Sequence, residues 1–251
     1  MRRICPDGLY DPRFEHDACG VGFVVNIDGS VTHTIVRQGI QVLENLVHRG
    51  ACGCDPDTGD GAGMLMQLPH RFFAEVAESL KFELPPKGEY AVGMVFLPTK
   101  AKDRKDCMKI FEAAVQKEGQ TVLGWREVPR DSSALGWLAR QNEPVIQQIF
   151  IKREGGLDIE GFERTLLVIR KAVEKTIRES EISLKEQFYV PSLSARTICY
   201  KGLMLAHQMD RYYPDLSHEM FESALALIHQ RYSTNTLPTW PLAHPFRFLA
   251  H

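Results

Sequence analysis

Hydrophobic and polar positions follow two different periods along the chain, and the two periods predict strands and helices in mixed order. Short apolar runs between turn residues are typical of buried strands. Such runs occupy residues 19–27, the end of 51–69, 90–98, 124–128, 144–153, 225–232 and 246–250. Apolar residues at every third or fourth position predict helices. This spacing occurs in residues 32–50, 71–80, 101–119 and 161–180, so the two kinds of element alternate loosely.

The strongest helix signal lies in residues 161–180. One stripe of apolar residues recurs there at helical spacing, namely Phe162, Leu166, Ile169, Val173 and Ile177. We expect this stripe to pack against the core, with the charged residues between its members forming a solvated face. In residues 32–50 a threonine is available as the N-cap and Gly50 as the stop signal, so we expect a helix along this segment.

Composition and charge exclude several classes of function. The chain has 251 residues, of which 44% are hydrophobic, as is ordinary for a globular protein. Thirty basic and thirty-two acidic side chains form no long run of one sign, so we expect no nucleic-acid partner. No apolar run reaches the roughly eighteen residues of a membrane span, and no secretory signal opens the chain. We therefore expect no membrane association and a cytoplasmic or organellar location.

The cysteines are expected to be free thiols, and the acidic loop does not fit a metal site. Six cysteines are scattered without the density of a disulfide scaffold. Cys52 and Cys54 lie near His48, but zinc sites of the usual kind need a second pair of ligands, which the sequence lacks. In the loop DPDTGDG, Gly59 stands where an EF-hand needs its third ligand and Met66 where it needs a glutamate. The sequence therefore predicts no metal site.

Residues 1–18 contain proline, glycine and many charges without a regular period, so we expect a poorly structured leader. Cys19 follows the leader and is itself followed by Gly20. A cysteine at an amino terminus can use its own α-amine, with an ordinary pKa of about 7.7–8.0, as the base that takes its proton. Cys19 can become such a nucleophile only after residues 1–18 are removed. From the residues alone, the alternative is a buried, inert thiol.

Four segments together resemble one protein family. LYDPRFEHDACGVGFV, HRGACGCDPDTGDGAG, RTICYKGLM and HQRYSTNTLPTWPLAHPFRFLAH are similar, in this order, to the amino-terminal glutaminase domain of the glutamate synthase large subunit. That domain is a class II glutamine amidotransferase, one of the N-terminal-nucleophile hydrolases. The resemblance implies a leader over 1–18 and an amidotransferase domain over 19–251. It also implies an α+β fold, a four-layer α/β/β/α sandwich with two stacked sheets between helical layers.

The resemblance also implies roles for individual residues. Cys19 would attack the side-chain amide of L-glutamine, forming a γ-glutamyl thioester and releasing ammonia. Arg231 would bind the α-carboxylate of glutamine, a task that suits its planar fork of donors. From the residue alone, a salt bridge at the rim is the alternative for Arg231. Thr234 resembles the hydroxyl that borders the same pocket, and Tyr232 and Asn235 are expected to make further contacts.

Two glycine-containing segments resemble the surroundings of the thiol in this family. They are HRG at 48–50 and GDGAG at 59–63, and they make Arg49 and Asp60 expected contacts of the substrate. The physical reading agrees, because glycines at 59, 61 and 63 permit tight turns that no side chain could follow.

The family pattern differs from this chain after FRFLAH, residues 246–251. It continues with an Asn-Gly pair that supplies the oxyanion hole and with an acidic residue that binds the α-amine. We therefore expect a truncated domain, incomplete at the C-terminus. The alternatives to a working glutaminase are an inactive fragment or a glutamine-binding module. A Cys/His thiol peptidase is a third reading, but no histidine-centred motif supports it.

The resemblance places further chemistry outside this chain. It implies that FMN and an iron–sulfur cluster belong to downstream synthase domains, so that no cofactor is expected here. Ammonia would pass from Cys19 to 2-oxoglutarate in those domains. The electron donor would be a nicotinamide-linked small subunit or ferredoxin, and a plastid location would apply to a plant or algal protein.

Overall fold

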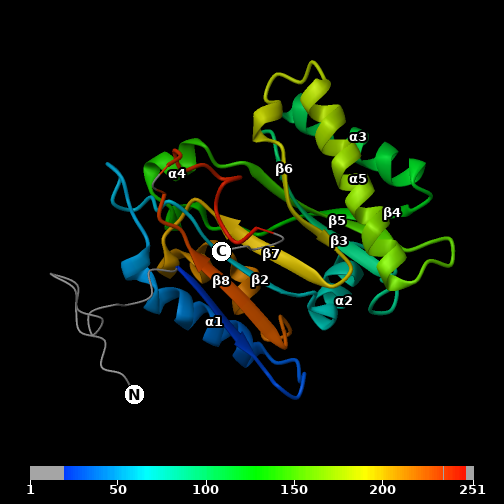
Figure 1. Ribbon diagram of the computed structural model, residues 1–251. Helices are drawn as coiled ribbons and strands as arrows, with labels where there is room; N and C mark the ends of the chain where they lie inside the picture. The colour runs from blue at the N-terminus through cyan, green and yellow to red at the C-terminus, as the bar shows by residue number, and fades with distance from the viewer. Residues whose placement is uncertain (1–19, 234, 247–251) are drawn as a thin grey trace, which may run out of the picture.

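The computed structural model describes residues 20–233 and 235–246, which form two four-stranded antiparallel sheets with helices packed on them (Figure 1). Sheet 1 consists, in spatial order, of β1 (Val21–Val25), β8 (Leu225–Gln230), β2 (Ala62–Gln67) and β7 (Thr197–Gly202). Sheet 2 consists of β4 (Thr121–Glu127), β5 (Val145–Lys152), β3 (Tyr90–Leu97) and β6 (Tyr189–Ser194). The two sheets with their helices confirm the predicted α+β class.

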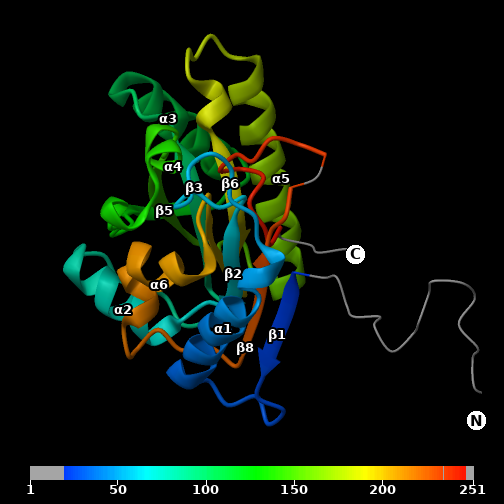
Figure 2. The ribbon, with the colours of Figure 1, turned by 90° about the vertical axis from the view of Figure 1, so that its left-hand side faces the viewer.

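The helices pack on these sheets in separate groups. The α-helices of the described residues are α1 (His33–Asn45), α2 (His70–Ser79), α3 (Ala101–Lys117), α4 (Trp137–Gln141), α5 (Ile159–Glu179) and α6 (Met209–Tyr212). Short 3₁₀ helices are η2 (Val47–Arg49), η3 (Ser132–Ala134), η4 (Lys185–Gln187), η5 (Ala206–Gln208) and η6 (Pro214–Ser217). Helix α1 lies along sheet 1, whereas α3 and α5 lie side by side on sheet 2 (Figures 1 and 2).

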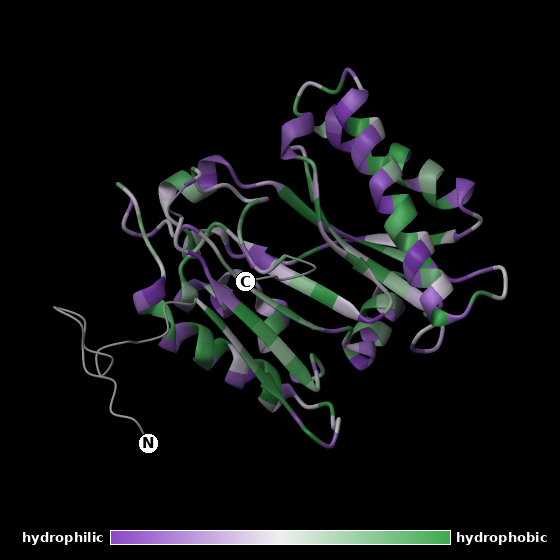
Figure 3. Cartoon of the chain, in the orientation of Figure 1, coloured by the Kyte–Doolittle hydropathy of each residue, from purple (hydrophilic) through white to green (hydrophobic). Residues whose placement is uncertain are grey.

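Strand β3 shows how the sequence builds two cores. Neighbouring side chains of a strand point to opposite faces of the sheet. The even-numbered residues from Tyr90 to Phe96 belong to a large core shared with sheet 1, α1 and α2. Ala91, Val95 and Leu97 belong to a smaller core shared with α3 and α5. Because both faces are covered, every residue of this strand is buried, and green, the colour of hydrophobic residues, recurs along the strands of both sheets in Figure 3.

Helix α5 confirms its prediction, because all five residues of its apolar stripe are buried in the smaller core. Helix α1 differs from its prediction. The helix ends at Asn45 instead of continuing to Gly50, and Val47 is 52% exposed. Its continuation tightens because the Arg49 N–H donates to the Leu46 carbonyl, three residues back, which makes the 3₁₀ helix η2. Thr32 is the N-cap residue, but its side chain makes no capping hydrogen bond.

Strands β6 and β7 lie in a segment where the sequence predicted no element. Pro191 lies inside β6, and proline normally argues against a strand because it cannot donate to the ladder. It is tolerated here because β6 is an edge strand of sheet 2. The run predicted at 246–250 falls, apart from residue 246, outside the described residues. Within residues 20–233 and 235–246, no helix has both the length and the apolar character that a membrane crossing requires.

Candidate active site

One end of sheet 1 brings together segments that are distant in the sequence. Gly20 precedes β1, and its carbonyl accepts a 2.7 Å hydrogen bond from the backbone N–H of Gln230, the last residue of β8. The next N–H, that of Arg231, donates at 2.8 Å to the carbonyl of Gly61, which precedes β2. The covalent neighbour of Cys19, the GDGAG loop and the HQRYSTNT segment therefore meet at this sheet end.

Glycine is needed at this end because backbones approach closely. A Cβ at Gly20 would lie 2.0 Å from the carbonyl oxygen of Gln230, far inside van der Waals contact. Gly61 has a φ of +133°, and a Cβ there would lie 2.8 Å from the Cβ of Ala243. Such backbone conformations and distances exclude larger residues, so the glycines fit the expected tight turns.

Arg231 is buried at this end, with 8% of its surface exposed. Its Nη2 donates to Oγ1 of Thr236 at 2.6 Å, and its Nη1 makes a long contact of 3.4 Å with the Asp60 carbonyl. Burial lowers the pKa of Arg231, and the nearby Asp60 acts against this, but an arginine remains charged at neutral pH. No carboxylate of the described residues forms a direct salt bridge with it, which disfavours the rim salt-bridge alternative.

Asp60 positions the chain around Arg231. Its Oδ2 accepts a 2.6 Å hydrogen bond from the backbone N–H of Ser233, and its own N–H donates to the carbonyl of Ala51 at 2.9 Å. The carboxylate is buried, with the residue 8% exposed. The Ser233 hydroxyl in turn donates to the Thr236 carbonyl. Through its hydrogen bonds, Asp60 therefore connects the acidic loop to the segment that follows β8.

The HRG segment lies against the same sheet end. Arg49 is half-buried at the end of η2, and its Cβ is 3.6 Å from where a Cβ of Gly20 would lie. A Cβ at Gly50 would lie 2.4 Å from the side-chain Nε2 of Gln230. These contacts bring the predicted residue Arg49 beside the start of β1.

The remaining predicted residues differ in their placement. Tyr232 is 64% exposed and Asn235 is exposed, so both stand at the surface beside Arg231 in the chain. Cys19 and Thr234 lie outside the described residues, and their roles stay predictions. Sequence reasoning missed Ser233 and Thr236, which bond to Asp60 and Arg231. The signal that could have indicated them is the run of hydroxyl and amide residues directly after Arg231.

Residues 240–246 cover sheet 1 near this end. The buried Lys201 ammonium donates to the carbonyls of Pro241 at 2.8 Å and Ala243 at 2.6 Å. The rings of His229 and His244 are in contact at a tilt of 48°, with centroids 4.4 Å apart. Burial, followed by the charges of Arg231 and Lys201, lowers the pKa of His244 to about 4, so this histidine is neutral at neutral pH.

The acidic loop before β2 is held by the protein itself. Asp55 accepts hydrogen bonds from the Thr58 hydroxyl at 2.7 Å and from the Leu138 N–H of α4 at 2.9 Å. A Cβ at Gly136 would lie 2.5 Å from the Asp55 Oδ2, so the loop and α4 fit tightly. Within the described parts of the chain, no three His, Cys, Asp or Glu side chains gather as a metal site would require.

The described cysteines do not fit an iron–sulfur cluster, which needs four protein ligands around one centre. Cys52 and Cys54 are exposed, whereas Cys107 is buried in the smaller core and Cys199 is buried in β7. These thiols are spread over three parts of the fold, and no step of the chemistry is assigned to such a cluster in this chain.

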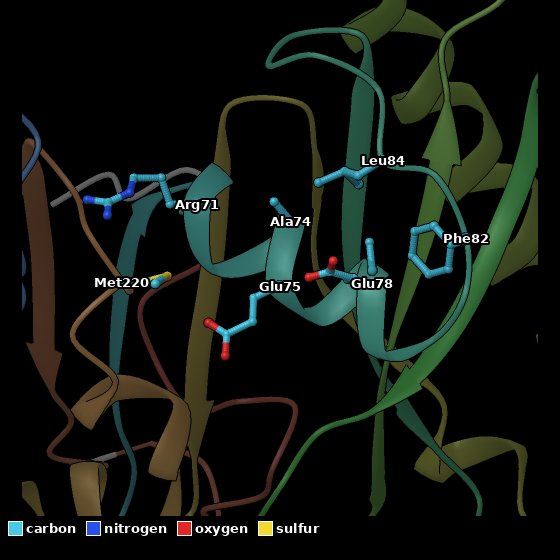
Figure 4. Close-up of a pocket in the computed structure, with 8 residues that line it drawn as sticks. Arg71, Ala74, Glu75, Glu78, Phe82, Leu84 and Met220 are labelled. Carbon is cyan, nitrogen blue, oxygen red and sulfur yellow. The ribbon is translucent and has the colours of Figure 1, made fainter.

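A separate hollow of about 560 Å³ lies on α2 and the chain that follows it (Figure 4). Its lining includes Arg71, Glu75 and Glu78 of α2 together with Phe82, Leu84 and Met220. None of the predicted site residues lines it. We therefore assign the candidate active site to the end of sheet 1.

The fold and the site together define a class of protein. A buried arginine suits a ligand with a carboxylate, and it lies at the glycine-rich end of an antiparallel α+β sandwich, near the residue bonded to Cys19. The chain belongs to the class II glutamine amidotransferases, because the family model described as "Glutamine amidotransferases class-II" matches residues 19–251.

Curated relatives agree with this family. The chain is 48% identical to a glutamate synthase [NADPH] large chain of Bacillus subtilis and 45% identical to that of Azospirillum brasilense. It is 40% identical to ferredoxin-dependent glutamate synthase 1, chloroplastic/mitochondrial, of Arabidopsis thaliana. These matches cover 96–97% of the chain. They cover only 15–16% of the relatives' length.

Proposed function

We propose that this chain is the glutaminase domain of a glutamate synthase and hydrolyses L-glutamine to glutamate and ammonia. The family match supports this proposal, and one observation carries it. Arg231, buried and without a direct salt bridge among the described residues, stands at the sheet end that begins with Gly20, the neighbour of Cys19. An α-carboxylate held at Arg231 would bring the substrate to the nucleophile.

The proposed reaction proceeds in two balanced steps. The Cys19 sulfur attacks the side-chain carbonyl carbon of glutamine, its proton passes by way of the α-amine to the leaving nitrogen, and ammonia leaves. Water then attacks the resulting γ-glutamyl thioester, which releases glutamate and restores the thiol. The α-amine exists only if the leader, residues 1–18, has been removed, so the proposed mature domain is 19–251. Thr234, Tyr232, Asn235, Arg49 and Asp60 are proposed as further groups of the substrate site.

The test is covalent labelling of the full-length protein with a diazo-ketone analogue of glutamine, read by intact mass. We expect a mature chain that begins at Cys19 and gains one adduct. Cys19→Ala should gain none, whereas Cys52→Ser, which removes an exposed thiol, should still gain one. An adduct on Cys19→Ala would refute the proposed nucleophile. Glutamine binding without adduct or ammonia, on a chain that keeps residues 1–18, would favour the glutamine-binding module instead.

The whole protein is proposed to transfer the ammonia to 2-oxoglutarate in downstream synthase domains that hold FMN and an iron–sulfur cluster. Support comes from the relatives, which are named glutamate synthases and of which the chain spans about 16%. Their names include both NADPH-dependent and ferredoxin-dependent enzymes, so either a nicotinamide-linked small subunit or ferredoxin is proposed as the electron donor. We propose a cytoplasmic location, or a plastid if the source is a plant or alga.

A further inference from the structure

The guanidinium of Arg231 is held by an uncharged acceptor, the Thr236 hydroxyl. The Arg231 Nη2 donates to Oγ1 of Thr236 at 2.6 Å. Because the guanidinium is a rigid planar fork of donors, one short hydrogen bond on Nη2 restricts the orientation of the whole group. Threonine supplies no negative charge, and within the described residues no carboxylate forms a salt bridge with Arg231. The hydroxyl therefore orients the guanidinium without neutralising its charge.

Thr236 is itself held in place by hydrogen bonds to the loop before β2. The Ser233 hydroxyl donates to the Thr236 carbonyl, and the Ser233 N–H donates at 2.6 Å to the buried carboxylate of Asp60 in that loop. The backbone N–H of Arg231 donates at 2.8 Å to the carbonyl of the next loop residue, Gly61. The same loop therefore fixes Arg231 through its backbone and Thr236 through Ser233.

The Thr236 side chain lies at the border between the buried arginine and the solvent. Arg231 is 8% exposed, whereas Thr236 belongs to an exposed stretch of chain. Substitutions at exposed positions usually change the stability of a protein little. The hydroxyl of Thr236 can therefore be altered without disturbing a core, and its effect on the arginine can be measured separately.

We propose that Thr236 is a positioning residue for substrate binding, whose hydroxyl holds the Arg231 guanidinium in the orientation that receives the α-carboxylate of glutamine. The inference rests on the proposed function, in which Arg231 binds that carboxylate. A guanidinium binds a carboxylate best through two parallel hydrogen bonds, which need a fixed plane. Fixing the long side chain beforehand also lowers the entropy cost of binding. A neutral hydroxyl does this without competing for the charge, whereas a carboxylate in its place would compete with the substrate.

Three variants of the full-length protein test the inference through the kinetics of ammonia release. Thr236→Val keeps the shape of the side chain and removes the acceptor, so we expect KM for glutamine to rise about tenfold. The α-carboxylate is remote from the reacting amide and is bound equally in the ground and transition states, so kcat should stay within about twofold. Thr236→Ser retains the acceptor and should keep KM near that of the unaltered protein. Thr236→Asp gives Arg231 an internal carboxylate and should raise KM beyond the valine variant.

Iodoacetamide provides a readout that separates positioning of the arginine from damage to the whole site. It alkylates a reactive thiol but carries no carboxylate. Thr236→Val should therefore be inactivated by iodoacetamide at the rate of the unaltered protein, while the diazo-ketone analogue of glutamine, at low concentration, should label it about tenfold more slowly. Equal slowing with both reagents would mean that the substitution disturbs the site as a whole, and would overturn the inference.

Thr239→Val is the matched control. Thr239 is an exposed threonine of the same segment and, within residues 20–233 and 235–246, makes no hydrogen bond to Arg231. This variant should leave KM, kcat and both labelling rates unchanged. The same KM in Thr236→Val and Thr239→Val would overturn the inference. Absence of both ammonia release and labelling in the unaltered protein would instead overturn the proposed function, so the two failures are distinguishable.

Discussion

Two buried arginines of this protein are bound in opposite ways. Arg126 of β4 makes a bidentate salt bridge with Asp215 at 2.6 and 2.8 Å and a further hydrogen bond of 2.9 Å to Gln148. The Tyr200 hydroxyl donates to the same Asp215 at 2.7 Å. Within residues 20–233 and 235–246, Arg231 has instead one hydrogen bond to a hydroxyl and one long contact with a carbonyl. The first arginine has a charged partner within the protein, whereas no carboxylate of the described residues forms a salt bridge with the second.

The pKa values express the same contrast. Burial acts to lower the pKa of both guanidinium groups. For Arg126 the hydrogen bond and charge of Asp215 prevail over burial and raise the pKa. For Arg231 burial prevails over the attraction of Asp60 and lowers it. A charge buried without full compensation is expensive for folding, and an anionic substrate that supplies the missing partner would recover that cost on binding.

The largest effect is expected on stability at Arg126, the arginine with a buried salt bridge. Arg126→Met leaves Asp215 buried without its partner, and we expect the free energy of unfolding to fall by about 3–5 kcal/mol. Urea denaturation measures this loss. The control is Arg71→Met, because Arg71 is 65% exposed in its salt bridge with Glu222 and should cost less than about 1 kcal/mol. Equal losses in the two variants would show that burial of the pair is unimportant.

The second prediction concerns Arg231, which has no salt bridge among the described residues, and should show the reverse pattern. Arg231→Met is expected to weaken glutamine binding by about 2–5 kcal/mol, the cost of removing one partner of a buried charge pair. Its unfolding free energy should change by only about 1 kcal/mol. Calorimetric titration with glutamine and urea denaturation measure the two quantities. A large stability loss with unaltered binding would assign Arg231 to the scaffold.

The sequence predicted the strands and helices with clear periods because local patterning decides them. The stripe of α5 and the apolar run of β3 are both where the pattern placed them. The sequence could not predict β6, since its pairing with β3 and its edge position override the signal of Pro191. The end of α1 also differed, because the chain after Asn45 tightens into the 3₁₀ helix η2, which the apolar spacing does not distinguish from a continued α-helix.

The candidate site was predictable only in part. The resemblance supplied Arg231, Asp60 and Arg49, and the fold brings them to one end of sheet 1. It gave no indication of the hydrogen bond that the Ser233 backbone N–H donates to Asp60, or of the buried Gln230 side-chain amide, which has no hydrogen bond among the described residues. Such features depend on which backbones meet at the sheet end, and a chain pattern carries no information about them.

The third prediction concerns the chain over the site. Lys201→Met removes the donor of both the Pro241 and Ala243 carbonyls, and hydrogen bonds from a charged group contribute about 1.5–3 kcal/mol each. We expect the free energy of local opening of residues 240–246 to fall by about 2 kcal/mol. Amide hydrogen exchange measures it, with α5 as the internal reference. Faster exchange in α5 to the same extent would indicate global destabilisation instead.

The smallest effect is a dependence of stability on pH that originates at the same segment. The pKa of His244 falls from 6.5 to about 4 in the folded protein. As the pH drops, the unfolded chain therefore binds a proton at His244 before the folded protein does. This protonation lowers the free energy of unfolding progressively between about pH 6.5 and 4. At pH 7 both states are neutral and the residue has no such effect. His244→Gln should show a smaller loss of unfolding free energy from pH 7 to pH 5 than the unaltered protein. Identical losses would mean that His244 is protonated in the folded state, and that the charges of Arg231 and Lys201 do not act on it.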